Sequence, residues 1–459
     1  MTPEYRPLSR RDLLKILGLA AGATALPRFA SAADDAGRPI LLPNPAPMGG
    51  RAVTAITLGA GSRGNVYGGF AAKYPEQLKI VGVAEPIALR NERYAKTHSI
   101  PANQRFNTWE DVFTRPKFAD AIIITTPDNL HYGPCMKALA AGYDVLLEKP
   151  IAPTEQECRD ILRLANETGR IVGVCHVLRY APYFIRLREL IRSGAIGQVI
   201  SLQHMEPIEH THMAHSYVRG NWHNSRETTP IILAKSCHDL DIIRWLVDSP
   251  SRKIQAFGDL KWFRKENAPA GSTERCTDGC PAEAGCPYSA VRHYHVRRKR
   301  TFVFDLPDDK ALHSEHILQR LRTTNYGRCV YRMDNDQPDH YVTNIQFANG
   351  VTSSFSMEAF TSYAGRQTRV MGSHGDIVGD MQRFTLTNFV TGKKEEFSQT
   401  TDGHGGGDWR LASAWVQAVS RHDPSYLSSS LEASIESHIM GFMAERSRLE
   451  NRVVDVVMS

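Results

Sequence analysis

Three glycines and a carboxylate occur at the spacing of a dinucleotide-binding turn. The segment Gly59-Ala60-Gly61-Ser62-Arg63-Gly64 follows a short apolar run, and Glu85 directly follows the next such run. In a turn of this kind the first glycine permits a tight bend, the second lets the backbone approach a pyrophosphate, and the third lets the following helix pack closely on the strand. A helix that begins here would present its amide groups and its positive dipole end to the phosphates. The spacing therefore predicts a dinucleotide site.

Glu85 also bears on which dinucleotide is bound. A carboxylate at the end of the second strand accepts hydrogen bonds from the ribose hydroxyls and repels a 2′-phosphate. Glu85 therefore favours NAD over NADP, although Arg63 and Arg90 lie close enough in the sequence to leave NADP open.

Further polar residues follow later apolar runs, where the carboxyl ends of parallel strands would line the same crevice. Lys149 follows one such run in the segment Glu148-Lys149-Pro150. Its ammonium could hydrogen-bond a substrate hydroxyl, or share a proton if burial lowers its pKa. The residues that we expect at the cofactor are Gly59, Gly61, Ser62, Arg63, Gly64, Glu85, Thr126, Pro127, Asn129, His131, Glu148 and Lys149.

The elements that must position these residues alternate between strands and helices from residue 51 onward. Short apolar runs such as Val53–Leu58 and Leu78–Ala84 alternate with helical segments, which predicts a parallel sheet covered by helices on both faces. We expect a doubly wound Rossmann domain over residues 51–175. Residues 176–459 contain hairpin signals such as Asn349-Gly350, and predict a substrate-binding α/β domain with an open, mostly antiparallel sheet.

The composition is that of a globular enzyme and gives little support to a nucleic-acid partner. The chain has 459 residues, of which 42% are apolar and 23% charged, and this length predicts two domains. The formal net charge is +6, but residues 1–32 contribute +3 of it through five cations and two anions, which leaves +3 for the rest. The basic run at residues 297–300 is typical of a solvated loop. We therefore expect no nucleic-acid partner.

The first 32 residues have the pattern of a twin-arginine signal peptide. Arg10-Arg11 precedes an apolar run over residues 16–26, which is too short for a permanent membrane span, and Ala30-Ser31-Ala32 forms a small-residue cleavage site. Because such signals export folded proteins, we expect the twin-arginine export machinery as a partner, a periplasmic or otherwise exported location, and a cofactor acquired before export. We expect no stable membrane insertion, and a flexible linker over residues 33–50.

Seven short motifs occur in one order along the chain. They are residues 59–64, Ala84-Glu85-Pro86, Thr126-Pro127, His131, Glu148-Lys149-Pro150, Arg179-Tyr180-x-Pro182 and His238-x-x-Asp241. In this order they resemble the Gfo/Idh/MocA oxidoreductase family, named for glucose–fructose oxidoreductase and inositol dehydrogenase, and in particular its exported twin-arginine subgroup. The resemblance implies NAD(P)-dependent chemistry at CH–OH groups of a sugar, glycoside or polyol, carried out by a homo-oligomer. It also implies that Lys149 and His238 are the two catalytic residues.

One segment departs from the family pattern. Family members commonly carry Asp-x-Gly-x-His, whereas this chain has Ala234-Lys235-Ser236-Cys237-His238. The missing acid would lower the basicity of His238 or change how the substrate is oriented. A second function therefore stays open, in which tightly bound NAD oxidises a sugar carbon transiently, and elimination, hydration and re-reduction complete a net glycoside hydrolysis.

Several residues near this segment have side chains that could bind a sugar. A Trp ring can stack on a pyranose face while Arg and Asn side chains bind hydroxyls. The alternative is a structural loop that packs its aromatic ring on the sheet. The residues that we expect at the substrate are Arg179, Tyr217, Arg219, Asn221, Trp222, Lys235, Asp241 and His404.

Three of the eight cysteines lie close together in a segment rich in Pro and Gly. Cys276, Cys280 and Cys286 could hold a structural zinc ion through their thiolates, or two of the cysteines could form a disulfide in an oxidising compartment. Their spacing is not the paired pattern of zinc ribbons, so the sequence leaves both readings open. The segment His210-x-His212-x-x-His215 is also compatible with a metal, although loop histidines are commonly free.

Overall fold

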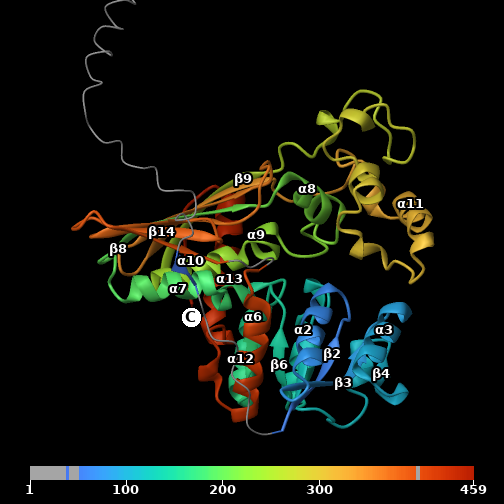
Figure 1. Cartoon of the computed structure of the whole chain (residues 1–459), viewed down its shortest axis with the longest axis horizontal. Helices are drawn as coiled ribbons and strands as arrows, with labels where there is room; N and C mark the ends of the chain where they lie inside the picture. Colours follow the sequence, from blue (N-terminus) through green and yellow to red (C-terminus); the bar gives the residue numbers. More distant parts are fainter. Residues whose placement is uncertain (1–37, 41–50, 400–403, 459) are drawn as a thin grey trace, which may run out of the picture. The chain divides into compact units, whose positions relative to one another are not determined.

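The computed structural model describes residues 38–40, 51–399 and 404–458 (Figure 1). The predicted signal peptide and most of the predicted linker lie outside these residues. A short part of that linker, β1 (Arg38–Pro39), pairs in parallel with the edge strand β15 (Lys394–Ser398) instead of lying free. Among the described residues, no helix combines the length and the apolar character that a membrane crossing needs.

The first half of the described chain forms a parallel sheet of six strands. The strand order is β4-β3-β2-β5-β6-β7, every pair is parallel, and the strands are apolar and mostly buried because helices cover both faces. The chain order reverses beside β2, which places a ligand crevice at the carboxyl ends of β2 and its neighbours. The strands are β2 (Val53–Leu58), β3 (Leu78–Ala84), β4 (Arg105–Phe106), β5 (Ala121–Ile124), β6 (Asp144–Leu147) and β7 (Val172–Val174).

One helix of this Rossmann layer comes from far along the chain. The early helices are α2 (Ser62–Lys73), α3 (Ala88–His98), α5 (Tyr132–Ala140) and α6 (Glu155–Thr168). They are joined by α12 (Gly407–Arg421), whose apolar face belongs to the same buried cluster as β2 and α2. The indole N–H of Trp415 in α12 donates to the carbonyl oxygen of Val145 in β6 at 3.0 Å. The Rossmann core therefore draws on a segment outside residues 51–175.

The second half is built on a larger sheet, which has ten strands in the described residues. All its neighbouring pairs are antiparallel except β1 with β15 and β8 with β11, so the predicted fold class is confirmed. Helices α7 (Pro182–Arg192), α10 (Cys237–Val247) and α13 (Leu431–Glu450) lie on one face, between this sheet and the Rossmann half (Figure 1). The strands not yet named are β8 (Val199–Pro207), β9 (Ser251–Asp259), β10 (His340–Phe347), β11 (Thr352–Glu358), β12 (Gln367–Gly372), β13 (Gly375–Gly379), β14 (Arg383–Asn388) and β16 (Val454–Asp455).

An insertion, residues 260–339, separates β9 from β10. It consists of short helical turns and the helix α11 (His313–Thr323), and it stands to one side of the sheet (Figure 1). It has a small core of its own, in which Tyr294 and Phe304 pack with Ile317 and Leu321 of α11. The insertion contains the cysteine-rich segment singled out in the sequence.

Candidate active site at the end of the Rossmann sheet

Two of the three glycines in the turn occupy positions where a Cβ would clash with the backbone. Gly59 follows β2 with a φ of +93°, and a Cβ there would lie 2.7 Å from the carbonyl oxygen of Thr125. A Cβ on Gly64, in the first turn of α2, would lie 2.2 Å from the carbonyl oxygen of Gly59. A Cβ on Gly61 would meet only the guanidinium of Arg90, at 3.8 Å. Gly59 and Gly64 therefore serve the packing of the turn, while the space in front of Gly61 is left for a ligand.

This contrast predicts different results for two alanine substitutions. Gly64→Ala should cost about 1–3 kcal/mol of unfolding free energy, because the clash is with backbone and the helix must shift. Gly61→Ala is the matched control and should leave the unfolding free energy within about 0.5 kcal/mol of wild type while weakening nucleotide binding. Denaturant unfolding and nucleotide titration measure the two effects. Equal losses of stability in both variants would contradict the assignment.

Glu85 spans the glycine turn at the end of β3. Its carboxylate accepts hydrogen bonds from the backbone N–H of Ala60 at 2.8 Å and from that of Ile87 at 3.0 Å. These contacts fix the carboxylate between the turn and the start of α3. The cradle formed by the open Gly61 face and this carboxylate fits a dinucleotide whose ribose hydroxyls reach Glu85.

Some of the remaining predicted cofactor residues lie exposed at the rim of the crevice, and others are buried and hold its loops in place. Ser62, Pro127 and Asn129 are exposed and Thr126 is half-buried, as expected for a rim. His131 is buried, and its two ring nitrogens lie 2.7 Å from the carbonyl oxygen of Pro150 and 3.0 Å from that of Thr126. His131 therefore fastens two loops of the crevice to one another and has no nitrogen free for the nucleotide.

Lys149 stands at the carboxyl end of β6 and reaches into the second half of the chain. Its Nζ donates to the carbonyl oxygen of Ala234 at 2.7 Å, and its backbone N–H donates to Glu148 Oε2 at 3.0 Å. Glu148 is buried and accepts from Arg63 Nε at 2.6 Å and from the Tyr67 hydroxyl at 2.9 Å. Burial opposes the ionisation of Glu148, but the charges of Arg63 and Lys149 outweigh it and hold its pKa below the ordinary value. Glu148, which also accepts from the backbone N–H of Lys149, thus ties the end of β6 to α2, the helix of the glycine turn.

His238 lies in the first turn of α10 and is buried beside this lysine. Burial lowers the pKa of His238 well below its ordinary value, and the positive charges of Lys149 and His404 add to the effect. Among the described residues its Nδ1 has no hydrogen-bond partner. A neutral imidazole with an open nitrogen can accept a proton from a substrate hydroxyl.

A ring contact followed by polar contacts joins His238 to the helix of the glycine turn. The rings of His238 and His404 are 5.7 Å apart, and His404 Nδ1 lies 3.1 Å from Asp408 Oδ2. The other oxygen of Asp408, in α12, accepts from Arg63 Nη2 at 2.6 Å. His404, which the sequence predicts at the substrate, thus lies beside His238, whereas Asp408 carries no signal in the sequence beyond its place after three glycines.

The altered segment before His238 has its own arrangement. Where the family pattern has an acid, the backbone carbonyl of Ala234 accepts from Lys149, and Lys235 turns to Glu206 of β8, with Nζ and Oε1 3.1 Å apart. Burial lowers the pKa of Lys235, against the opposing effect of Glu206. Glu206 also pairs with Arg366 at 2.8 Å. Lys235 is therefore held by the sheet, with 15% of its side chain exposed.

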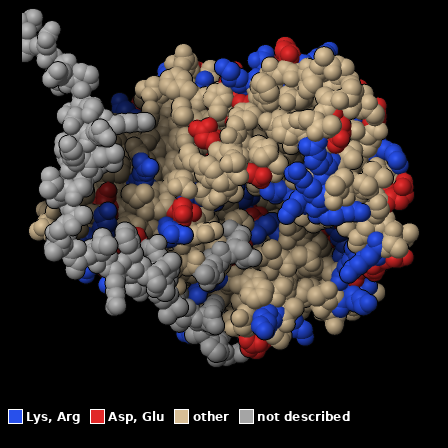
Figure 2. All heavy atoms as spheres, turned by 45° about the horizontal axis from the view of Figure 1, so that its top comes forward, with Lys and Arg blue, Asp and Glu red and all other residues tan. Residues whose placement is uncertain are grey.

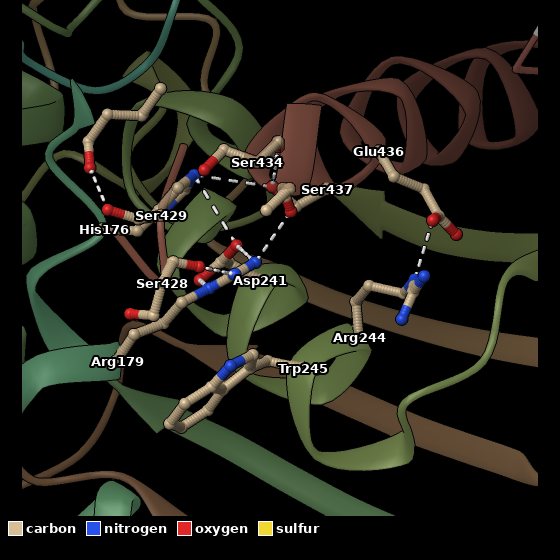
Figure 3. Close-up of polar contacts among 12 residues, drawn as sticks. His176, Arg179, Asp241, Arg244, Trp245, Ser428, Ser429, Ser434, Glu436 and Ser437 are labelled. Carbon is tan, nitrogen blue, oxygen red and sulfur yellow. Dashed lines mark hydrogen bonds and ion pairs between the residues drawn. The ribbon is translucent and has the colours of Figure 1, made fainter. Parts of the chain in front are cut away.

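Arg179 and Asp241 are occupied with one another and not with a ligand (Figure 3). Arg179 Nε and Nη2 donate to the two oxygens of Asp241 at 2.7 and 2.6 Å, and Nη2 also donates to the carbonyl oxygen of Ala433 at 2.9 Å. Arg179 is 3% exposed and Asp241 1%. The expectation that both contact substrate needs correction, because no polar atom of the pair is left for one. They join the turn Val177–Tyr180 to α10 and α13.

In the loop of residues 215–222, some of the side chains predicted at the substrate are accessible and others are buried. Tyr217 and Trp222 lie with their rings 6.1 Å apart, Trp222 is half-buried and Asn221 is exposed. Arg219 is buried and donates to the carbonyl oxygens of Arg328 at 2.7 Å and Tyr288 at 2.8 Å, both in the insertion. Arg219 therefore anchors the insertion, which corrects its expected role at the substrate.

The cysteines of the insertion share one cavity. Cys276, Cys280, Cys286 and Cys329 all line it, and each is a free thiol. No group of three or more His, Cys, Asp or Glu side chains in the described residues is placed to hold a metal ion. The cavity lies next to Arg219 and apart from the Lys149 and His238 pair.

Comparison with known sequence families covers nearly all of the described chain. Residues 54–176 match the NAD-binding Rossmann fold of an oxidoreductase family, and residues 188–456 match the C-terminal alpha/beta domain of the same family, Gfo/Idh/MocA. The chain belongs to the Gfo/Idh/MocA oxidoreductase family. It is thus a member of a family of NAD-binding oxidoreductases, in agreement with the site described above.

Individual relatives are distant. A 1,5-anhydro-D-fructose reductase of Ensifer adhaerens is 27% identical over 42% of this chain and 56% of its own length. A 2,7-anhydro-N-acetylneuraminate hydratase of Escherichia coli K12 is 26% identical over 32% of this chain and 39% of its own length. The matched segment thus spans only about two fifths to three fifths of these relatives. A levoglucosan dehydrogenase solved with NADH and levoglucosan has the same fold, with a TM-score of 0.65 and 16% identity over 88% of this chain and all of that one.

Proposed function

We propose that the chain is an NAD-dependent oxidoreductase that acts on a CH–OH group of a sugar, glycoside or polyol, with Lys149 and His238 as its catalytic residues. The observation that carries the proposal is that a lysine from the Rossmann half and a neutral histidine from the second half meet at the end of the sheet. The chain of contacts through Arg63, Asp408 and His404 connects them to the glycine turn.

The chemistry follows from the protonation states of these side chains. Held at the open face of Gly61 and the carboxylate of Glu85, NAD would supply the acceptor for the hydride of the carbinol carbon. Neutral His238 accepts the hydroxyl proton, and the ammonium of Lys149 stabilises the alkoxide that develops as the proton leaves. Ala234 orients that ammonium through its carbonyl oxygen. The half-buried ring of Trp222, which packs against the buried Tyr217, offers aromatic surface for a sugar ring.

The pH dependence of turnover tests the role of His238. Only the neutral ring can act as the base, and burial lowers its pKa below about 6.5. Activity should therefore persist as the pH falls through 6.5 and decline only when the lowered pKa is reached. The test is kcat/KM as a function of pH, compared with a His238→Gln variant that lacks the acid limb. An acid limb at or above the ordinary pKa of histidine would contradict a buried neutral base.

A second function is favoured by the altered segment at Ala234. Without the acid, a site that oxidises and re-reduces a glycoside around an elimination step is consistent with the hydratase among the relatives. Incubation with aryl glycosides without added NAD separates the two functions. A simple dehydrogenase releases no aglycone, whereas the hydrolase releases it repeatedly while its nucleotide returns to the starting redox state.

We further propose that the protein is exported by the twin-arginine machinery with NAD already bound, and works as a homo-oligomer in the periplasm. The support is the sequence pattern of residues 1–32, and the reasoning that a compartment without free NAD requires a retained cofactor. A native mass spectrum of the exported protein would give its number of copies and its bound nucleotide together. Replacing Arg10 and Arg11 with lysine should keep the protein in the cytoplasm.

The cysteine cavity is the place for the proposed structural zinc. Four thiols around one volume are the chemistry that zinc prefers, although their sulfur atoms would have to move closer to one another. Metal analysis of protein purified without chelator separates the two alternatives, and one zinc per chain would support the metal site. Its absence, with two fewer titratable thiols before reduction than after, would instead support a disulfide.

A further inference from the structure

The structure places an arginine of the Rossmann half over the nucleotide site. Arg90 lies in the first turn of α3, and its Nη1 is the nearest atom to the open face of Gly61, at 3.8 Å from the position of a Cβ there. Burial lowers the pKa of Arg90, but the hydrogen bond and charge of Asp305, with a smaller contribution from the charge of Glu85, raise it above the ordinary value. A guanidinium beside the ribose carboxylate is the group that would bind the 2′-phosphate of NADP.

A carboxylate of the insertion binds the guanidinium of Arg90. Asp305, in the insertion, accepts from Arg90 Nε through Oδ1 at 2.6 Å and from Arg90 Nη2 through Oδ2 at 3.0 Å, which is a two-pronged pair. The pair is only partly exposed, with 30% of the Arg90 side chain and 23% of that of Asp305 accessible. Two of the guanidinium nitrogens are thereby turned away from any ligand.

A second contact fixes Asp305 in place. One turn further along α3, Arg93 donates to the carbonyl oxygen of Leu306 at 2.9 Å and to Asp308 at 2.5 Å. Asp305 itself has a φ of +49°, so its backbone is in the left-handed region that the loop must hold. Helix α3 therefore bonds both ends of the segment 305–308, through Arg90 at Asp305 and Arg93 at Asp308.

We propose that the insertion completes the nucleotide site, and that Asp305 selects NAD over NADP by neutralising Arg90. This inference rests on the proposed binding of NAD at the glycine turn. With Arg90 paired, a 2′-phosphate would meet the carboxylates of Glu85 and Asp305, and the guanidinium would offer it only Nη1, with its charge already balanced by Asp305. Ribose hydroxyls, which carry no charge, do not meet this repulsion.

The positive surface charge around the nucleotide site favours NADP, so discrimination against NADP depends on the Arg90–Asp305 pair. Lys and Arg side chains gather on the side of the molecule where the insertion faces the Rossmann half (Figure 2). The basic run at residues 297–300 precedes Asp305 in the same insertion. A positive field of this kind would attract the more highly charged NADP. Rejection of NADP must therefore come from the two carboxylates next to Arg90.

The test is the ratio of the dissociation constants of NAD and NADP. In Asp305→Ala the affinity for NADP relative to NAD should rise about 10-fold or more. The gain should disappear in Asp305→Ala combined with Arg90→Ala, because the freed guanidinium provides it. Asp308→Asn is the matched control: its carboxylate is 92% exposed and bonds Arg93, and the ratio should stay within about 2-fold of wild type.

The outcomes separate this inference from the function on which it rests. Wild-type protein that binds neither nucleotide would overturn both. Wild-type protein that binds NAD, with a ratio unchanged in Asp305→Ala, would overturn the role of Asp305 alone. Asp305→Asn keeps the size of the side chain and removes its charge, so it gives the same reading if the alanine variant fails to fold. Thermal unfolding of each variant establishes that it is folded.

Discussion

Lys149→Ala is expected to lower kcat by about 10²–10⁴-fold, the range associated with losing a positioned proton-transfer or charge-stabilising group. The Nζ of Lys149 is the cation that the structure places at the meeting point of the two halves, and no other described ammonium bonds the carbonyl of Ala234. The fall in kcat is measured with a sugar or polyol that the wild-type protein oxidises, by following the absorbance of the reduced nicotinamide. The nucleotide should remain bound, because Gly61 and Glu85 form its cradle and Lys149, although expected at the cofactor from its motif, bonds the carbonyl oxygen of Ala234.

Two further variants give this prediction its controls. Lys117, on the surface of the Rossmann half, also donates to a backbone carbonyl, that of Gly142 at 2.5 Å, but far from His238 in the fold. Lys117→Ala should keep full activity. Lys149→Arg retains the charge but not the compact ammonium, and should recover only part of the rate. Unchanged turnover in Lys149→Ala on every substrate would remove the catalytic assignment.

The nucleotide half of the site was predictable because its signals are local. Gly59 and Glu85 each directly follow an apolar strand, and Gly64 lies in the first turn of the helix that follows Gly59, where the backbone leaves no room for a Cβ. Lys149 was found in the same way, directly after the strand β6. In a parallel sheet all strands end at the same edge, so the residues that directly follow the strands in the sequence line one crevice.

The partners of these residues were not predictable, because they are set by packing between distant segments. Arg63 was expected at the nucleotide, yet it bonds Glu148 and Asp408, the latter on the late helix α12. Arg90 was weighed only as a determinant of NADP, and its carboxylate partner lies in the insertion. No periodicity in the sequence indicates that α12 packs on β2, or that residues 305–308 reach α3.

Arg179 and Asp241 show why a charged residue in a family-like motif need not touch a ligand. Both belong to the same set of motifs as Lys149 and His238, and both have side chains that can bind hydroxyls. The fold buries them together, however, and a buried charge is stable only when it is paired. Their function is to fix α10, which carries His238 less than one turn before Asp241, to the chain that leaves β7 (Figure 3).

Asp241→Asn is accordingly expected to cost about 3–5 kcal/mol of unfolding free energy, since it leaves the guanidinium of Arg179 buried without a countercharge. Denaturant unfolding measures this loss. Arg179→Met combined with Asp241→Leu should recover most of it, because replacing both charges with apolar groups of similar size removes the unpaired charge. The exposed pair Arg186–Glu189 provides the control, and Glu189→Gln should cost less than about 1 kcal/mol.

Activity distinguishes a framework role from a substrate role for the same pair. If Arg179 and Asp241 only position α10, the doubly apolar variant should regain stability and much of its kcat, with KM close to that of wild type. If they bind substrate, the same variant would be stable but would show a KM raised by at least about 10-fold, the loss of a charged hydrogen bond. The bidentate geometry, with every strong donor of Arg179 on a protein oxygen, favours the first result.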